Sequence, residues 1–469
     1  MKQSTITGNA GKWLLLLGVV FTCTRGMAQQ QAPTLAELAE KAIAKSYDLA
    51  NAELGIAAER ETRQSIREVY LPHLEANGKY AYLNSDLKVD IPTATLPLLD
   101  LPIFEGSTSF PTHGNLWTAD LTASAVLFSG TKAPKMGKAL DYKIEAEEHL
   151  LEKQRQDIIE QVSTAYDQLA LLKQVQRVLD DSRKRLAIEK ETAEKAFGYG
   201  LITSYELRKV DVAQATLAAK QQEYEGKHDL LLKQLNQLTD VPVDELATID
   251  ADLLPYSVDN NAAGVDNRPE IAALDAAIEA SNYKIAAEKT HWIPKVQAIA
   301  RIGYYGLSDA ALKTPYHLPV SGQPVRLDLN RLQAFPTYTV GIGMKWDIFD
   351  GNAGKREVNK ARIALKQAEN NRAQAGELLR LNLDKAQTEY ELANKQLTAA
   401  DVRKTTAQTA VQLAHKEYQV GLIKVAERIG AETDYQQAAL DYAQAIFDQR
   451  RAAHQLLLAT GSLTIDQLK

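Results

Sequence analysis

Apolar and polar residues alternate with a period of two in four segments of this chain, whereas a helical period prevails elsewhere. The four segments are residues 73–83, 116–128, 295–306 and 337–349. In the last of them the apolar positions are Tyr338, Val340, Ile342, Met344, Trp346 and Ile348. A period of two predicts β-strands with one apolar and one polar face.

The polar face of these strands carries both signs of charge. Its charged members are Glu75, Lys79, Asp120, Lys295, Arg301, Lys345 and Asp347. Each segment has about the 9–11 residues that a tilted membrane strand needs, and aromatic residues gather near the segment ends. A soluble sheet with one wet face would alternate identically. The position of the strands between long helices favours membrane strands, whose charged residues would line a barrel lumen.

Two very long helices and two medium helices are expected around these strands. The long helices cover about 134–197 and 354–418, and the medium helices about 204–239 and 425–459. A heptad seam is formed by Ile158, Ala165, Leu172, Leu179, Leu186 and Ala193, with Val162 and Leu169 between them. Helices of this length and period are typical of coiled coils.

The chain contains an internal duplication. Adding 221 to a position in the first half gives its partner in the second half across both long helical stretches: Gly200-Leu201-Ile202, for example, corresponds to Gly421-Leu422-Ile423. We therefore divide the mature chain into a first repeat at 29–240, a connector at 241–268 and a second repeat at 269–469.

Helix and loop signals complete each repeat. Thr34 to Glu37 forms a capping-box motif, which predicts a helix that continues to about Tyr70 and ends before Pro72. Residues 84–114 and 307–335 contain several prolines and are expected to be the long loops that join the strands of each pair.

The N-terminus reads as an export signal. Residues 1–28 combine Lys2 and Lys12, an apolar core and the small residues Gly26 and Ala28 before a predicted cleavage site. Cleavage would change the net charge from −6 to −9 and would remove the only cysteine, Cys23. A lipoprotein anchor on Cys23 is an alternative that the bulky Phe21 disfavours. No nucleic-acid partner is expected for this acidic chain.

Four strands cannot close into a barrel, because about eight is the practical minimum. Open sheet edges in lipid would leave backbone groups unpaired. A membrane barrel therefore requires several chains: two would give eight strands and three would give twelve. The residues themselves do not choose between these two assemblies.

Catalytic and cofactor chemistry finds no support in the sequence. The eight histidines are scattered without metal-ligand spacing, and no nucleophile constellation is present. Gly341 and Gly343 lie in a predicted strand and lack the third glycine and the helix of a dinucleotide site. We expect no enzyme activity, no cofactor and no metal.

The order and spacing of these features resemble the TolC-type outer membrane efflux proteins. The resemblance rests on the two helix–hairpin–long helix–helix repeats, on Phe-Ser-Gly (128–130) and Phe-Asp-Gly (349–351), and on Tyr-Gly-Leu-Ile-Thr (199–203) and Val-Gly-Leu-Ile-Lys (420–424). It covers nearly the whole mature chain. It implies a mainly α fold with membrane β-structure, namely a homotrimer with a twelve-stranded barrel in the outer membrane of a Gram-negative bacterium and a twelve-helix coiled-coil tube in the periplasm.

The resemblance also implies roles for individual residues. The tips that dock a periplasmic adaptor would be Tyr199, Gly200 and Leu201 in the first copy, and Val420, Gly421 and Leu422 in the second. Six residues beyond each glycine, Glu206 and Glu427 would stand at the periplasmic aperture. Glu206 also completes a capping box with Thr203, whereas Lys424 occupies the equivalent position before Glu427. Gly430 stands where some relatives carry a second acid.

Three functions are compatible with this reading. The first is a passive exit duct for drugs or other small molecules, working with an adaptor and an inner-membrane pump. The second is the same duct serving type I protein secretion. The third is a periplasmic coiled-coil protein without a pore, against which the strands with aromatic ends argue.

Overall fold

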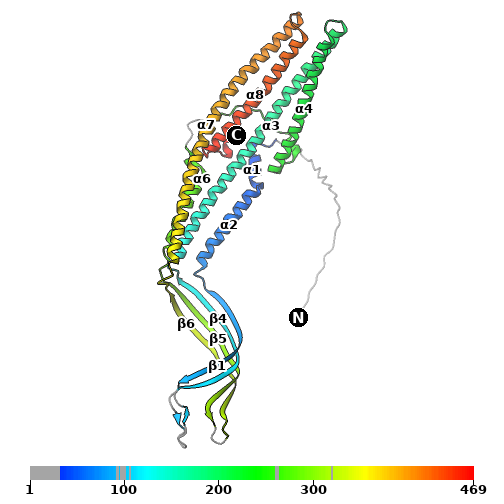
Figure 1. Ribbon diagram of the computed structural model, residues 1–469. Helices are drawn as coiled ribbons and strands as arrows, with labels where there is room; N and C mark the ends of the chain where they lie inside the picture. The colour runs from blue at the N-terminus through cyan, green and yellow to red at the C-terminus, as the bar shows by residue number, and fades with distance from the viewer. Residues whose placement is uncertain are drawn as a thin grey trace, which may run out of the picture.

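The molecule is a long bundle of helices with a β-sheet at one end (Figure 1). The computed structural model describes residues 32–90, 94–95, 102–104, 107–258, 264–317 and 321–468. The expected signal segment at 1–28 lies outside the described residues. Among the described residues, no helix combines the length and the apolar character that crossing a membrane requires.

The first helical segment consists of two helices instead of the single helix expected up to Tyr70. Helix α1 spans Leu35–Lys45 and α2 spans Tyr47–Glu68. Ser46 separates them, because its backbone is extended and its hydroxyl accepts a hydrogen bond from the Leu49 N–H at 3.3 Å. Serine competes with the helix in this way and starts a new one. The capping box of Thr34 and Glu37 is present as expected.

Four long strands form one antiparallel sheet in the order β1-β4-β5-β6. Their bounds are His73–Asp90 (β1), Ser107–Phe128 (β4), Lys295–His317 (β5) and Pro324–Lys345 (β6); two short strands, Ala94–Thr95 (β2) and Pro102–Phe104 (β3), pair separately. The β4–β5 pairing joins the hairpins of the two copies. Strands β1 and β6 are left as the two edges of the sheet.

The strands are longer than their alternating segments, so the expectation of loops throughout 84–114 and 307–335 was wrong. The β1–β4 register runs without a break from His73 opposite Ser124 to Asp90 opposite Ser107. Antiparallel pairing satisfies backbone N–H and C=O groups whatever side chains are present, so it continues where the apolar alternation has ended. At the other end, β6 stops at Lys345 and not near 349, which places Asp347 outside the strand.

The register gives the sheet one polar and one apolar face. One row across the four strands is Glu75, Thr122, Arg301 and Thr339; the next row, on the opposite face, is Ala76, Leu121, Ile302 and Tyr338. No described part of the chain covers the apolar face, and Val340 on it is 83% exposed. Such an exposed apolar surface is the expected outside of a membrane barrel.

Aromatic residues mark both ends of this apolar band. At the end far from the helices, the rings of Tyr80 and Trp117 lie 4.5 Å apart. At the helix end, the Trp346 indole N–H donates to the carbonyl oxygen of Trp292 at 2.9 Å. The band between these aromatic residues coincides with the four alternating segments, and the remaining strand residues extend beyond it.

The helices of the tube follow the expected succession. Their bounds are Lys132–Gly198 (α3), Ser204–Thr239 (α4), Val243–Leu246 (α5), Pro269–Glu288 (α6), Ala353–Gln419 (α7) and Val425–Ala459 (α8), with short 3₁₀ turns at Val265–Asn267 (η1) and Ile465–Leu468 (η2). Helices α3 and α7 each have 67 residues, about 100 Å of helix.

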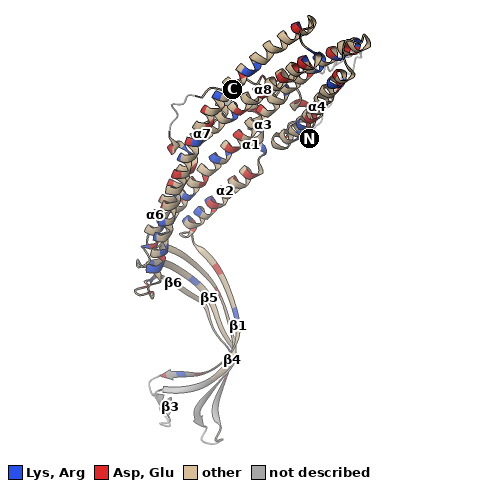
Figure 2. Cartoon of the chain, turned by 45° about the horizontal axis from the view of Figure 1, so that its top comes forward, with Lys and Arg blue, Asp and Glu red and all other residues tan. Residues whose placement is uncertain are grey.

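The heptad seam of α3 is buried as predicted. Val162, Leu169 and Leu179 are almost inaccessible, and they pack in one core with α1 and α4. Charged residues are dense along the helices and sparse on the described part of the sheet (Figure 2). The surface of the helices is therefore suited to water, in contrast to the apolar face of the sheet.

Candidate functional site

Two helical turns lie together at the end of the molecule farthest from the sheet (Figure 1). Gly200 and Gly421 adopt left-handed backbone conformations, with φ of +71° and +76°. The next residue closes each turn: the Leu201 N–H donates to the Ala196 carbonyl at 2.8 Å, and the Leu422 N–H donates to the Glu417 carbonyl at 2.9 Å. Glycine is required at both turns because other residues resist a positive φ.

Large apolar side chains at these turns point into solvent. Leu201 and Leu422 are each 75% exposed, and Tyr199 and Val420 are similarly accessible. Buried residues directly below them, including Ala193, Val210 and Val425, form a small apolar core that joins the two turns. The structure thus brings the two predicted tips side by side and leaves their apolar residues uncovered.

The side chain of Glu206 caps the N-terminus of its own helix, α4. Its carboxylate accepts hydrogen bonds from the Thr203 N–H at 2.9 Å and the Thr203 hydroxyl at 3.1 Å. These donors favour the charged carboxylate and lower the pKa of Glu206, and nearby Lys424 and Lys209 lower it further. Lys424 comes from the second copy, so the two turns interact electrostatically. The capping role that Thr203 predicted for Glu206 is confirmed.

Glu427 has a different environment. It is exposed, and its carboxylate has no ion pair or hydrogen bond with the described residues; its backbone N–H is bonded to the Lys424 carbonyl at 3.0 Å. It lines a shallow groove between α7 and α8, next to Gly430 and Asp434. A Cβ atom on Gly430 would meet nothing within 4 Å, so the space beside Glu427 is open. The carboxylate of Glu427 is available to solvent and ions.

Asp434 is an acid that the sequence reasoning missed. It lines the same groove as Glu427, and a spacing of seven residues places both on one face of α8. Attention to this spacing, instead of to position 430 alone, would have found it. The groove also contains Arg403, which forms an ion pair with Asp441 at 3.3 Å.

A network of ion pairs joins α8 to α3 just below the tips, and no local sequence pattern indicates it. Arg185 donates to the Glu432 carboxylate at 2.6 Å, and Arg428 contacts the Glu189 carboxylate. Burial raises the pKa of Glu432, an effect that Arg185 and Arg428 oppose, and burial lowers the pKa of Arg428. The Arg428 guanidinium also lies 4.8 Å from the centre of the Tyr418 ring.

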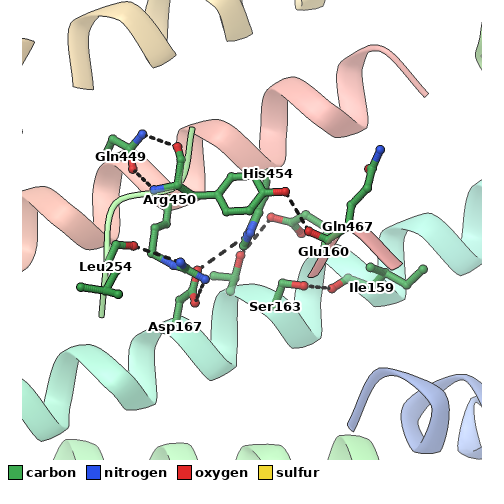
Figure 3. Close-up of polar contacts among 11 residues, drawn as sticks. Ile159, Glu160, Ser163, Asp167, Leu254, Gln449, Arg450, His454 and Gln467 are labelled. Carbon is green, nitrogen blue, oxygen red and sulfur yellow. Dashed lines mark hydrogen bonds and ion pairs between the residues drawn. The ribbon is translucent and has the colours of Figure 1, made fainter. Parts of the chain in front are cut away.

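A second buried polar cluster lies midway along the tube (Figure 3). Arg450 on α8 pairs with Asp167 on α3 at 2.8 Å and donates to the Leu254 carbonyl at 3.0 Å. His454 is 1% exposed, and burial lowers its pKa. Gln449 holds the connector by donating to the Tyr256 carbonyl at 2.6 Å. This cluster fastens the connector and both copies to one another.

The predicted lumen residues share one face of the sheet, with one exception. Glu75, Lys79, Asp120, Lys295, Arg301 and Lys345 all lie on the polar face in the observed register. Arg301 donates to the Thr122 hydroxyl at 2.9 Å and lies 3.7 Å from the Asp120 carboxylate. Asp347 follows the end of β6 and lies 3.8 Å from Lys345.

Within the part of the chain that the structure describes, no group of three or more histidine, cysteine or acidic residues could hold a metal ion.

Comparisons with known proteins agree on one family. The sequence profile described as "Outer membrane efflux protein" matches residues 38–241 and 265–462. The outer membrane efflux protein BepC of Brucella suis is 21% identical over 371 residues, which cover 78% of this chain and 76% of BepC.

Solved structures of outer-membrane channels have the same fold. The channel OprN aligns with 93% of this chain and 91% of its own, at 16% identity and a TM-score of 0.69. VceC of Vibrio cholerae aligns with 91% of this chain and 96% of its own, at 17% identity and a TM-score of 0.67. CmeC of Campylobacter jejuni aligns with 91% of this chain and 85% of its own, at 15% identity and a TM-score of 0.66.

Proposed function

Because this chain belongs to the family of outer membrane efflux proteins, we propose that it is the exit duct of a tripartite efflux system. In this proposal the duct is a homotrimer that works with a periplasmic adaptor and an inner-membrane pump. The family is one of outer-membrane channels and not of enzymes. The channel itself is passive, and the pump supplies the energy for transport. The cargo is a drug or another small molecule.

The observation that carries the proposal is the exposed apolar face of a sheet with two open edges. Strands β1 and β6 have no further partner among the described residues. In lipid, their unpaired backbone groups would cost several kcal/mol each, so the edges must pair with other copies. Three copies would place β6 of each chain beside β1 of the next and close a twelve-stranded barrel. Its polar face, with Glu75, Arg301 and their neighbours, would line the lumen.

The acids near the tips support an aperture that favours cations. In a trimer, Glu206 and Glu427 would supply six carboxylates around the axis, and Asp434 would add three more below them. Rings of carboxylates attract cations and repel anions. Glu427 and Asp434 are the stronger candidates, because Glu206 already binds its own helix cap.

The exposed apolar tips support docking to an adaptor. Tyr199, Leu201, Val420 and Leu422 would be unfavourable in water unless a partner covered them. Both turns lie at the same end of the tube, so one partner surface can contact both. We assign the adaptor interface to these two tips.

The test is a measurement of single-channel currents from the purified protein in planar bilayers, with the mass of the detergent-solubilised species determined in parallel. We expect discrete, cation-selective openings from a species of three times the monomer mass. A stable trimer that opens only after Glu427→Gln would indicate a closed aperture at this position. A water-soluble species without pores would contradict the proposal.

A further inference from the structure

A cavity of about 560 Å³ lies at the corner where the helices meet the sheet. One wall is apolar and is formed by Ile66 and Val69 at the end of α2 and by Ala133 and Met136 at the start of α3. The other wall is the sheet itself. This volume falls within the range of about 300–1,000 Å³ that is usual for small-molecule sites.

The cavity opens on the polar face of the sheet. Val126, Gln297 and Gly343 lie opposite one another on β4, β5 and β6 and belong to its lining. Gln297 has the same strand parity as Arg301, so both side chains project from the same face. This is the face that would line the duct in the proposed function.

Two lysines stand at the cavity, and only one of them has a carboxylate partner among the described residues. Lys295 and Lys345 are directly opposite on β5 and β6, and both line the cavity. Lys345 lies 3.8 Å from the exposed Asp347, whereas Lys295 has no carboxylate within 4 Å among the described residues. Like charges directly opposite on paired strands are unfavourable, and a bound anion would relieve their repulsion.

Gly343 leaves additional space on the side of the cavity that the sheet forms. A Cβ atom there would meet only the Gln297 carbonyl oxygen, at 4.0 Å, so packing within this chain does not demand a glycine. Glycine in a strand interior weakens the strand, and it often marks a position that a ligand approaches closely. The missing side chain therefore adds space beneath the two lysines.

We propose that this cavity binds small amphipathic anions as they pass through the duct. The acidic group of the ligand lies between Lys295 and Lys345. The apolar body lies over Gly343, against Met136 and the end of α2. The inference rests on the proposed function for the route by which the ligand arrives, and it adds a cargo class: compounds of drug size with one carboxylate or sulfonate and an aromatic or aliphatic body.

The chemistry of the lining selects this class over others. An amphipathic cation would be repelled by the lysine pair, and a sugar would leave its hydroxyl groups unpaired against the apolar wall. Lys132, the third lysine of the lining, is already paired with Glu288 at 2.7 Å. Recognition of the anion thus falls on Lys295 and Lys345.

The experiment measures binding of 1-naphthalenesulfonate to the assembled protein in lipid nanodiscs by equilibrium dialysis, with empty nanodiscs as the blank. The matched probe is 1-naphthylmethylammonium, which has the same naphthalene ring system and carries a positive charge. We expect saturable binding of the sulfonate, weaker at high salt, and binding of the cation at least about tenfold weaker. Equal binding of the two probes, or no saturable sulfonate binding, would overturn the inference.

Two variants test separately how the lysine charges and the shape of the cavity contribute to sulfonate binding. Lys295→Gln combined with Lys345→Gln removes the charge and should weaken sulfonate binding about tenfold. Gly343→Leu fills the cavity and should weaken it by a similar factor while leaving both lysines. Unchanged binding in either variant would contradict the site.

The chain offers a matched control for each variant. Lys135→Gln with Lys138→Gln removes two charges from the start of α3 outside the cavity lining. Gly341→Leu adds the same side chain one pleat away, outside the cavity lining, where a Cβ atom meets nothing within 4 Å. Both controls should bind like the unmodified protein; equal losses in the controls would overturn the proposed location.

Channel currents distinguish this inference from the proposed function. A trimer that conducts but does not bind the sulfonate overturns the anion site and leaves the duct intact. A species that forms no pores overturns the duct, and with it the cargo class assigned here. The trimer mass of each variant confirms that it has assembled before its binding is compared.

Discussion

The two tips of this molecule have the same backbone and different chemistry. Both turns close on a glycine with positive φ, and both place a glutamate six residues later. In the first copy, Thr203 binds Glu206 and makes it part of the helix cap. In the second copy, Lys424 occupies the position of Thr203, no side-chain cap forms, and Glu427 stays exposed. The two copies therefore share the turn geometry, but only the carboxylate of Glu206 takes part in a helix cap, and that of Glu427 does not.

The tips also differ in how they are anchored. The equivalent acids one turn below are Asp211 in the first copy and Glu432 in the second, 221 residues apart. Asp211 pairs with Lys190 at 3.3 Å and remains partly exposed. Glu432 is buried between Arg185 and Arg428 and ties α8 to α3. The second tip therefore combines a free acid just after the turn with a buried ion pair beneath it.

The largest expected effect comes from breaking that anchor. Glu432→Ala removes the carboxylate that Arg185 binds, leaves Arg428 with Glu189 alone, and should destabilise the start of α8 by about 2–3 kcal/mol. The value is below that of a fully buried pair because Arg185 reaches water. Hydrogen exchange of the α8 amides in the assembled protein measures the local opening.

Asp211→Ala is the matched control, since it removes the equivalent acid of the first copy. Its cost should be less than about 1 kcal/mol, because exposed ion pairs contribute little. Equal destabilisation by the two substitutions would refute the asymmetry between the tips.

An intermediate effect is expected for Glu427 and Glu206, the acids that we propose for the aperture. Glu427→Gln should reduce the ratio of cation to anion permeability about twofold, because it removes an unpaired charge. Glu206→Gln should have a smaller effect, because Lys424 and Lys209 already offset the Glu206 charge. Glutamine also preserves the capping box. Reversal potentials in a KCl gradient give both ratios, and a larger effect at Glu206 would reverse our assignment.

The smallest effect concerns pH and the Thr203 cap. Hydrogen bonds from Thr203 lower the pKa of Glu206 in the folded protein. The stabilisation by the charged Glu206 carboxylate is therefore fully present above its unfolded-state pKa, and it is lost as the pH falls through the lower folded-state pKa. In a Glu427→Gln background, Thr203→Ala should move the loss of the remaining cation selectivity to higher pH.

Reversal potentials recorded across acidic pH would reveal this shift. Thr216→Ala is the control, because the Thr216 hydroxyl donates to the Val212 carbonyl of its own helix. An identical pH profile with and without the Thr203 hydroxyl would show that the cap does not control the titration of Glu206.

Local patterns in the sequence predicted most of the fold. The medium helices begin and end at the expected residues, 204–239 and 425–459, and the long helices lie within two residues of their predicted ends. Turn glycines, capping residues and helical periodicity depend on residues only a few positions apart, so they can be recognised in the sequence alone. The break at Ser46 was missed because serine is also tolerated inside helices.

The errors in the strands have a different cause. Side-chain alternation reports only where one face is apolar, and backbone pairing extends beyond that region. Strand lengths were therefore underestimated in the segments after residue 83 and after residue 306, and the charged Asp347 was assigned to a strand that ends at Lys345.

The sequence by itself determined the helices of the tube, the two tips and the alternating faces of the strands, because each depends on residues two to seven positions apart. It also determined the duplication, because matching residues recur at a constant offset of 221. Only the tertiary structure decided which charged residues far apart in the sequence meet. Arg185 and Glu432 are 247 positions apart, and Lys295 meets Lys345 only through strand register. Such contacts depend on how whole helices and strands pack, which no local pattern specifies.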